Sequence, residues 1–178
     1  IGANTFFKAN EASDKLDING AFIGFVPATS KIINTKFLYN YAVSGRNEDE
    51  GAEGTPNSGT GGLIAGYCRG VIDNCKITLS GNSNIQITKW SINTNSASIA
   101  RHSYAFGGMV GVLAGNVGVV SNCAVDMQEG SLIKVHCDPS KAASGITGNK
   151  KGNGRVYLGG LIGWMGAGSN AFNLTVNG

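Results

Sequence analysis

The stretch Gly61-Gly62-Leu63-Ile64-Ala65-Gly66 decides the fold of this chain, because versions of it return along the sequence. The later versions are Gly107-Gly108-Met109-Val110-Gly111 and Gly159-Gly160-Leu161-Ile162-Gly163, and a degraded version, Gly20-Ala21-Phe22-Ile23-Gly24, comes first. Four ordered copies of this glycine motif indicate a repeat protein. The copies stand 41, 46 and 52 residues apart. The differences fall in polar loops, which is how a stacked array accepts insertions.

Each glycine motif is followed by short apolar segments separated by turns. Residues 71–79 and 119–125 predict strands, and residues 84–92 alternate apolar and polar side chains, which is typical of a half-buried strand. We therefore predict an all-β fold: a β-solenoid, similar to a parallel β-helix, that carries inserted loops or hairpins. The predicted units of this single domain are a partial repeat at 1–19, repeats at 20–60, 61–106 and 107–158, and a partial repeat at 159–178.

The composition supports stacked strands and excludes several classes of function. Glycine contributes 28 of the 178 residues, and only 14% of residues are charged, against about 25% in ordinary globular domains. The formal net charge of +3 is too small to indicate nucleic-acid binding. No apolar run is long enough for a membrane span. No motif indicates a cofactor or a metal site, and the acidic residues at 48–53 lack the ligand spacing of a calcium loop.

The glycines have a physical role in such a stack. A residue without a Cβ lets the backbone bend sharply or pack closely against a neighbouring strand. If the repeats stack in register, we expect Leu63, Met109 and Leu161 to point inward together. We also expect Asn74 and Asn122 to lie side by side as a buried ladder in which the amides satisfy one another.

Residues 61–79 and 107–125 resemble the GLUG repeat most clearly. The shared pattern is Gly-Gly-Leu-Ile-x-Gly, a short turn, and then Val-Ile-Asp-Asn-Cys-Lys-Ile, as residues 71–77 read here. The resemblance covers 159–176 in part and 20–38 weakly, and the repeats here are longer than the usual GLUG unit. It implies a β-solenoid scaffold of secreted or cell-surface proteins, including bacterial adhesins, and it implies no catalytic residues.

The four cysteines and one sequon predict covalent modifications of a secreted protein. An even number of cysteines without a Cys-x-x-Cys motif favours disulfides and an oxidising compartment. A hairpin turning at Gly130 would place Cys123 opposite Cys137, which leaves Cys68 to pair with Cys75. A pairing of Cys75 with Cys123 stays open, because both follow an asparagine at the same repeat position. Asn173 begins the sequon Asn-Leu-Thr, a candidate glycosylation site.

Few residues point to catalysis. Asp73 and Asp126 could serve a glycan-cleaving enzyme, but they do not occupy equivalent repeat positions. His102 and His136 show no metal-ligand spacing. We therefore predict a protein that is not an enzyme. Aromatic residues could stack on sugars, although packing within strands is the commoner use of such side chains; they are Trp90, Tyr104, Tyr157 and Trp164.

The points within a repeat at which the chain begins and ends suggest self-association outside the cell. The chain opens with a segment that precedes a glycine motif and ends midway through a repeat, so its two ends look like complementary halves. No polar capping repeat is visible. We therefore predict an extracellular or cell-surface structural protein whose copies stack head to tail into a filament. An excerpt of a longer repeat array would begin and end in the same way, and this explanation stays open. The alternative function is an adhesin that binds glycans or a host surface through loops 44–60 and 138–154; a glycan-active enzyme is the third hypothesis.

Overall fold

The structure is a computed structural model that describes residues 7–10, 17–20, 22–40, 42–47, 59–90, 104–138 and 156–178. These residues form strands and turns and contain no helix. The fold is therefore all-β, as the sequence predicted. The strands repeat in the same spatial order, once for each glycine motif.

The strands group into four copies preceded by one extra strand, β1 (Phe7–Asn10). The first copy holds β2 (Asp17–Gly20), β3 (Ile23–Val26), β4 (Lys31–Ile33), β5 (Lys36–Tyr39) and β6 (Ala42–Asn47). The second holds β7 (Gly59–Gly62), β8 (Ala65–Cys68), β9 (Val71–Asp73), β10 (Lys76–Leu79) and β11 (Asn84–Trp90). The third holds β12 (Tyr104–Gly107), β13 (Val110–Leu113), β14 (Val119–Met127) and β15 (Leu132–Asp138). The fourth holds β16 (Val156–Gly159), β17 (Ile162–Met165) and β18 (Asn170–Asn177).

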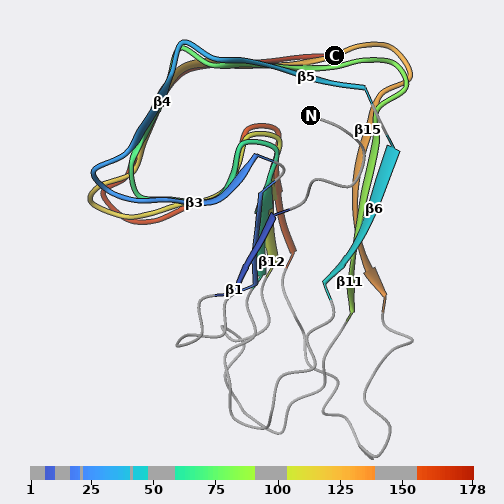
Figure 1. The fold of residues 1–178 in the computed structure, drawn as a ribbon, viewed down its shortest axis with the longest axis horizontal. Coiled ribbons are helices and arrows are strands. Elements are labelled where there is room, and N and C mark those ends of the chain that lie inside the picture. Colours follow the sequence, from blue (N-terminus) through green and yellow to red (C-terminus); the bar gives the residue numbers. More distant parts are fainter. Residues whose placement is uncertain are drawn as a thin grey trace, which may run out of the picture.

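Equivalent strands of successive copies pair in parallel and form four sheets, so the copies lie over one another when viewed as in Figure 1. The first sheet has the order β1-β2-β7-β12-β16, and the second has β3-β8-β13-β17. The third sheet joins β4 and β5 to β9 and β10, then to β14 and β18. The fourth sheet is β6-β11-β15. Each copy therefore contributes one layer to the stack. Among the described strands the only antiparallel pair is β1 with β2.

The glycine motif forms a tight bend between the first and second sheets. The register aligns Gly62 with Gly107 and Gly159, and the chain reverses over the next two residues into the second sheet. A Cβ built on Gly111 would lie 2.6 Å from backbone atoms of Gly61 and Gly66. The two sheets thus meet backbone to backbone, at a distance that any larger residue would prevent.

The tip of this bend is buried inside the frame formed by β3, β4 and β5 in Figure 1. Ile64 and Met109 are fully buried there, and the backbone N–H of Ile64 donates to the Met109 carbonyl oxygen at 2.9 Å. The Met109 N–H in turn donates to the Leu161 carbonyl oxygen at 2.9 Å. Leu63 is buried as well, but the residue in line with Met109 and Leu161 is Ile64. The predicted alignment was one residue off, because the second motif is one residue longer.

Inward-facing side chains of the third sheet complete the core. Ile77 lies between Phe37 and Val125 in the register, and all three are buried. The Tyr39 side chain is also buried, and its hydroxyl donates to the Leu63 carbonyl oxygen at the tip of the bend. This hydrogen bond ties the outer frame of the first copy to the bend of the second.

The expected hairpin around Gly130 does not form. Gly130 does make a turn, with a φ of 85°, but β14 before it and β15 after it belong to different sheets. β14 pairs with β9, β10 and β18, whereas β15 pairs with β11. Within the described residues of the third copy, the chain therefore passes from the third sheet to the fourth at this turn and forms no hairpin there. The sequence symmetry around Gly130 reflects a corner between sheets.

Substitution of Gly111 by alanine should destabilise the protein by about 2 kcal/mol or more, because the new Cβ overlaps backbone atoms that cannot move independently. The free energy of unfolding in urea measures the effect. Gly178→Ala is the matched control, since a Cβ there would find its nearest neighbour, the Met127 Cβ, at 3.5 Å. Equal stability of the two variants would contradict the tight contact between the first and second sheets.

Candidate functional site

The corner of the third sheet is made by one asparagine in each copy. Asn34, Asn74, Asn122 and Asn173 have φ values of 54°, 50°, 52° and 55°. This left-handed conformation is unfavourable for most L-residues, and asparagine tolerates it better than others. The corner asparagines therefore let the chain turn between the two halves of the third sheet at the same point in every layer.

The amides of these asparagines form a ladder along the stack. The Asn74 Nδ2 donates to Asn34 Oδ1 at 2.7 Å, and the Asn173 Nδ2 donates to Asn122 Oδ1 at 2.7 Å. Between them, the Asn122 Nδ2 donates to Asp73 Oδ1 at 2.9 Å. Asn74 and Asn122 thus hold equivalent positions, as predicted. They are exposed and not buried, and an aspartate carries the hydrogen bond at the middle step.

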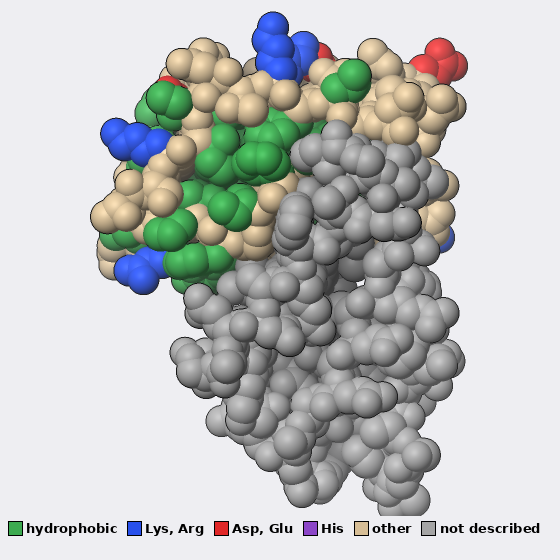
Figure 2. Space-filling model, viewed as in Figure 1, with side chains coloured by type: hydrophobic (Ala, Val, Ile, Leu, Met, Phe, Trp, Pro, Cys, Tyr) green, Lys and Arg blue, Asp and Glu red, His purple; other side chains and the backbone are tan. Residues whose placement is uncertain are grey.

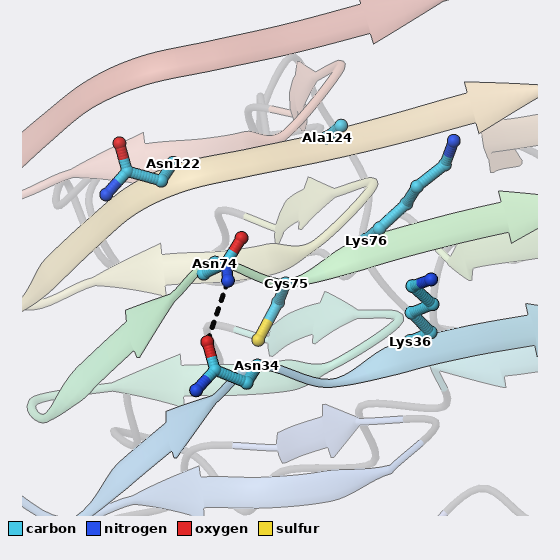
Figure 3. A pocket seen from close by; sticks show the side chains of 7 residues that line it. All are labelled: Asn34, Lys36, Asn74, Cys75, Lys76, Asn122 and Ala124. Carbon is cyan, nitrogen blue, oxygen red and sulfur yellow. Dashed lines mark hydrogen bonds between the residues drawn. The ribbon is translucent and has the colours of Figure 1, made fainter.

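The ladder borders a shallow groove of about 350 Å³ on the outside of the stack (Figure 3). The groove is lined by Asn34, Lys36, Asn74, Cys75, Lys76, Asn122 and Ala124. Lys36 and Lys76 are neighbours in the register of β5 and β10. Lys76 forms an ion pair with Asp126, whereas Lys36 has no such partner among the described residues. The groove therefore has amide groups on one side and two lysine side chains on the other, as Figure 3 shows.

Asp73 and Asp126 do not come together. In the register Asp73 lies opposite Ser121, whereas Asp126 lies opposite Thr78. Hydrogen bonds from Ser121 and then Asn122 lower the pKa of Asp73. A hydrogen bond from Lys76, followed by one from Asn177, lowers the pKa of Asp126. Both carboxylates are held ionised by their own partners, so neither has the raised pKa of a general acid.

The cysteines differ from the predicted disulfides. Cys68, Cys75 and Cys123 are buried free thiols. Cys68 ends β8 of the second sheet, whereas Cys75 lies at the corner between β9 and β10 of the third sheet, which explains why they do not pair across the turn at Gly70. Cys75 and Cys123 occupy equivalent positions in successive layers, and the Cys75 backbone N–H donates to the Cys123 sulfur at 3.4 Å. Cys137 lies on β15, away from Cys123, and its side chain is outside the described part.

Burial also makes these thiols poor nucleophiles. Desolvation raises the pKa of Cys68 to about 11 and that of Cys123 to about 11, and it raises the pKa of Cys75 as well. A thiol reacts as its thiolate, which becomes scarce when the pKa rises. Cys75 therefore borders the groove without offering it a reactive group.

The second notable surface is the pair of end faces of the stack. Eight of the ten exposed large hydrophobic side chains in the described residues belong to the first or the fourth copy; they are Phe22, Ile33, Leu38, Leu158, Trp164, Met165, Phe172 and Val176. The two middle copies expose only Val117 and Leu132. Figure 2 shows apolar side chains gathered on one such face, with lysine and arginine side chains toward its edge. Apolar surface gathered in this way is typical of an interaction site.

The other predicted residues are placed as follows. Asn173 is exposed, and it is the last member of the asparagine ladder. Trp164 is half exposed on β17. His136 lies on β15, but its side chain is outside the described part, as are His102, most of loop 44–60 and all of 139–154. Within the described ranges no group of three His, Cys, Asp or Glu side chains could hold a metal ion. No helix there could cross a membrane.

Sequence reasoning missed Asn34 and Asn173 as partners of Asn74 and Asn122. Both follow an apolar residue at the end of a half-strand, which is the signal that could have found them. The turns between the glycine motif and this asparagine differ in length among the copies. A fixed spacing from the motif therefore does not locate them.

Comparisons of the chain with family models, curated proteins and solved structures returned no match.

Replacement of Asn122 tests the corner of the third sheet. Asn122→Ala should lower the free energy of unfolding by about 1 kcal/mol more than Asn122→Gly, because alanine is strained at this positive φ and glycine is not. Both variants lose the hydrogen bonds to Asp73 and Asn173 equally. Urea unfolding measures the difference. An alanine variant as stable as the glycine variant would contradict the left-handed corner.

The thiols should be protected by the fold. In a Cys137→Ser variant we expect three thiols to react with a disulfide reagent after unfolding, and a rate at least tenfold slower in the folded protein. A thiol titration with and without denaturant measures both quantities. A count of one thiol after unfolding would instead support a disulfide between two of the three cysteines.

Proposed function

We propose that this chain is a non-enzymatic structural protein of the β-solenoid type. In this proposal, copies of the chain stack head to tail and form a filament or a surface fibre outside the cell. The proposal rests on the layered architecture, because among the described residues β3, β4 and β5 at one end of the stack and β17 and β18 at the other each have an edge without a partner strand.

One observation carries the proposal: the exposed large hydrophobic side chains concentrate on the first and fourth copies. Met165 is 43% exposed and Val176 is 48% exposed, whereas Leu113 and Val125, which are aligned with them in the third copy, are fully buried. Burial of apolar surface is favourable by about 25 cal/mol for each Å². A second copy that covers these faces would recover that free energy.

The location outside the cell rests on different support. It follows from the resemblance of residues 61–79 and 107–125 to the GLUG repeat and from the low charge and high glycine content. The cysteines give no support, because Cys68, Cys75 and Cys123 are free. Glycosylation at Asn173 would place a glycan on the fourth copy, where it would compete with the docking of another copy, so the sequon is not part of the support.

A second candidate function is a glycan-binding module. The observation in its favour is the groove along the asparagine ladder, whose amides and lysine ammonium groups suit the hydroxyl and carboxylate groups of a sugar. Such a module would act as a monomer, so the state of assembly separates the two functions.

A charge placed on an end face should block assembly. We expect the unmodified chain to form elongated particles as its concentration rises. Phe172→Lys should raise the concentration needed by about tenfold or more, which corresponds to about 1.4 kcal/mol, because a lysine buried without a partner is unfavourable. Val117→Lys is the matched control, because Val117 is an exposed turn residue inside the stack. Sedimentation velocity and negative-stain imaging measure the effect.

A monodisperse species of 18.3 kDa at every concentration would rule out the filament. If that monomer also bound to a glycan array, the second candidate would replace the first. Equal effects of the two lysine variants would show that assembly does not use the end face.

A further inference from the structure

We propose that the next copy docks on the fourth copy in the same parallel register that joins successive copies within the chain. In this arrangement β3, β4 and β5 of the arriving copy pair with β17 and β18, and β1 of the arriving copy leaves the edge of β2. This inference rests on the proposed self-association, and it specifies the partner surface, its register and a strand that controls access to it.

The asparagine ladder gives the stack a direction. The side-chain hydrogen bonds of the asparagine ladder run from the later copy to the earlier one: Asn74 donates to Asn34, and Asn173 donates to Asn122. The same direction holds for Asn122 to Asp73, Asn177 to Asp126 and Ser80 to Asn40. The ladder therefore ends with a free donor at one end of the stack and a free acceptor at the other.

These two ends are complementary. The Asn34 Nδ2 has no hydrogen-bond partner among the described residues, and Figure 3 shows it pointing away from Asn74. The Asn173 Oδ1 likewise has no partner among them. If a second copy continues the stack, its Asn34 donates to Asn173, and the ladder runs through the interface without a break.

The apolar side chains match in the same register. Phe25 pairs with Tyr67 within the chain, with ring centroids 5.9 Å apart. At the interface Phe25 would lie over Trp164, the equivalent residue of β17. Ile33 would lie over Phe172, since both are aligned with the position of Asp73 and Ser121. Each of these contacts would bury a side chain that is now half exposed.

The distribution of charge disfavours the other two arrangements of end faces. The first copy exposes Lys31 and Lys36, so two first copies in contact would bring like charges together. Residues 156–178 contain no charged side chain. Two fourth copies in contact would place two Asn173 acceptors together without a donor. Only the head-to-tail arrangement sets the lysines against neutral surface.

β1 is the obstacle to this arrangement. All four of its residues pair antiparallel with β2, at the edge that β16 of the preceding copy needs. β1 adds a strand to the first sheet only, so the second and third sheets cannot meet their partners while it stays. Pairing of β2 with β16 would replace four residue pairs with four others. β1 thus protects an open edge of the free protein and can be exchanged for a partner strand.

Cross-linking between copies tests the register. In a Cys137→Ser background, Lys36→Cys in one chain and Thr175→Cys in another should form a disulfide, because Lys36 and Thr175 share one position of the third sheet. We expect at least tenfold more cross-linked dimer in the mixture than in either variant alone. Lys31→Cys mixed with Thr175→Cys is the control, since Lys31 lies on β4, across the Asn34 corner from the position that β5 shares with Thr175.

A second pair of cysteines tests the role of β1. Lys8→Cys with Asn19→Cys in one chain joins two residues that face each other in β1 and β2. Oxidation of this variant should abolish assembly, and a reductant should restore it.

The outcomes separate this inference from the proposed function. If the chains assemble but cross-links form in the control mixture, or between two Lys36→Cys chains, the proposed register is wrong. Self-association would still stand in that case. Assembly of the oxidised Lys8→Cys, Asn19→Cys variant at the normal concentration would overturn the role of β1. Absence of assembly in the unmodified chain would overturn the proposed function itself.

Discussion

The contact between the backbones of the first and second sheets is the constraint on which the rest of the structure depends. Gly62 and Gly111 meet backbone atoms of the neighbouring sheet and layer at distances that leave no room for a Cβ. This contact lets the bend enter the frame of β3, β4 and β5 and place Ile64 and Met109 in the core. Because each layer makes the same contact, the layers must stack in one register. The glycine motif is thus a packing element that recurs along the chain.

The sequence was sufficient for the repeat, the all-β class and the equivalence of Asn74 with Asn122. These features follow from residue types that recur at the same positions of successive copies, such as glycine at the bend and asparagine at the corner. The prediction of a hairpin around Gly130 was wrong because β14 and β15 belong to different sheets. A turn residue alone does not determine with which strand the following strand pairs. The expected pairing of Cys68 with Cys75 depended on that choice of partners. The one-residue error at Leu63 arose from a motif of different length.

The candidate site could be predicted only in part for a related reason. Exposed apolar residues such as Met165 and Val176 look like core residues in the sequence, since Leu113 and Val125 at the equivalent positions of the third copy are fully buried. Their exposure is a property of the first and fourth layers. In the same way, the direction of the asparagine ladder emerges only when layers are placed over one another. Both features belong to the stack as a whole, and both concern its ends, where growth by another copy would occur.

The most direct measurement is of through-space contacts between backbone protons by nuclear magnetic resonance in the isotopically labelled protein. Parallel stacking in register predicts contacts that join Ile77 to Phe37 and Val125, and Val125 to Val176. Contacts between residues 119–127 and residues 131–138 along two antiparallel strands would contradict it, because they would restore the hairpin and abolish the layers.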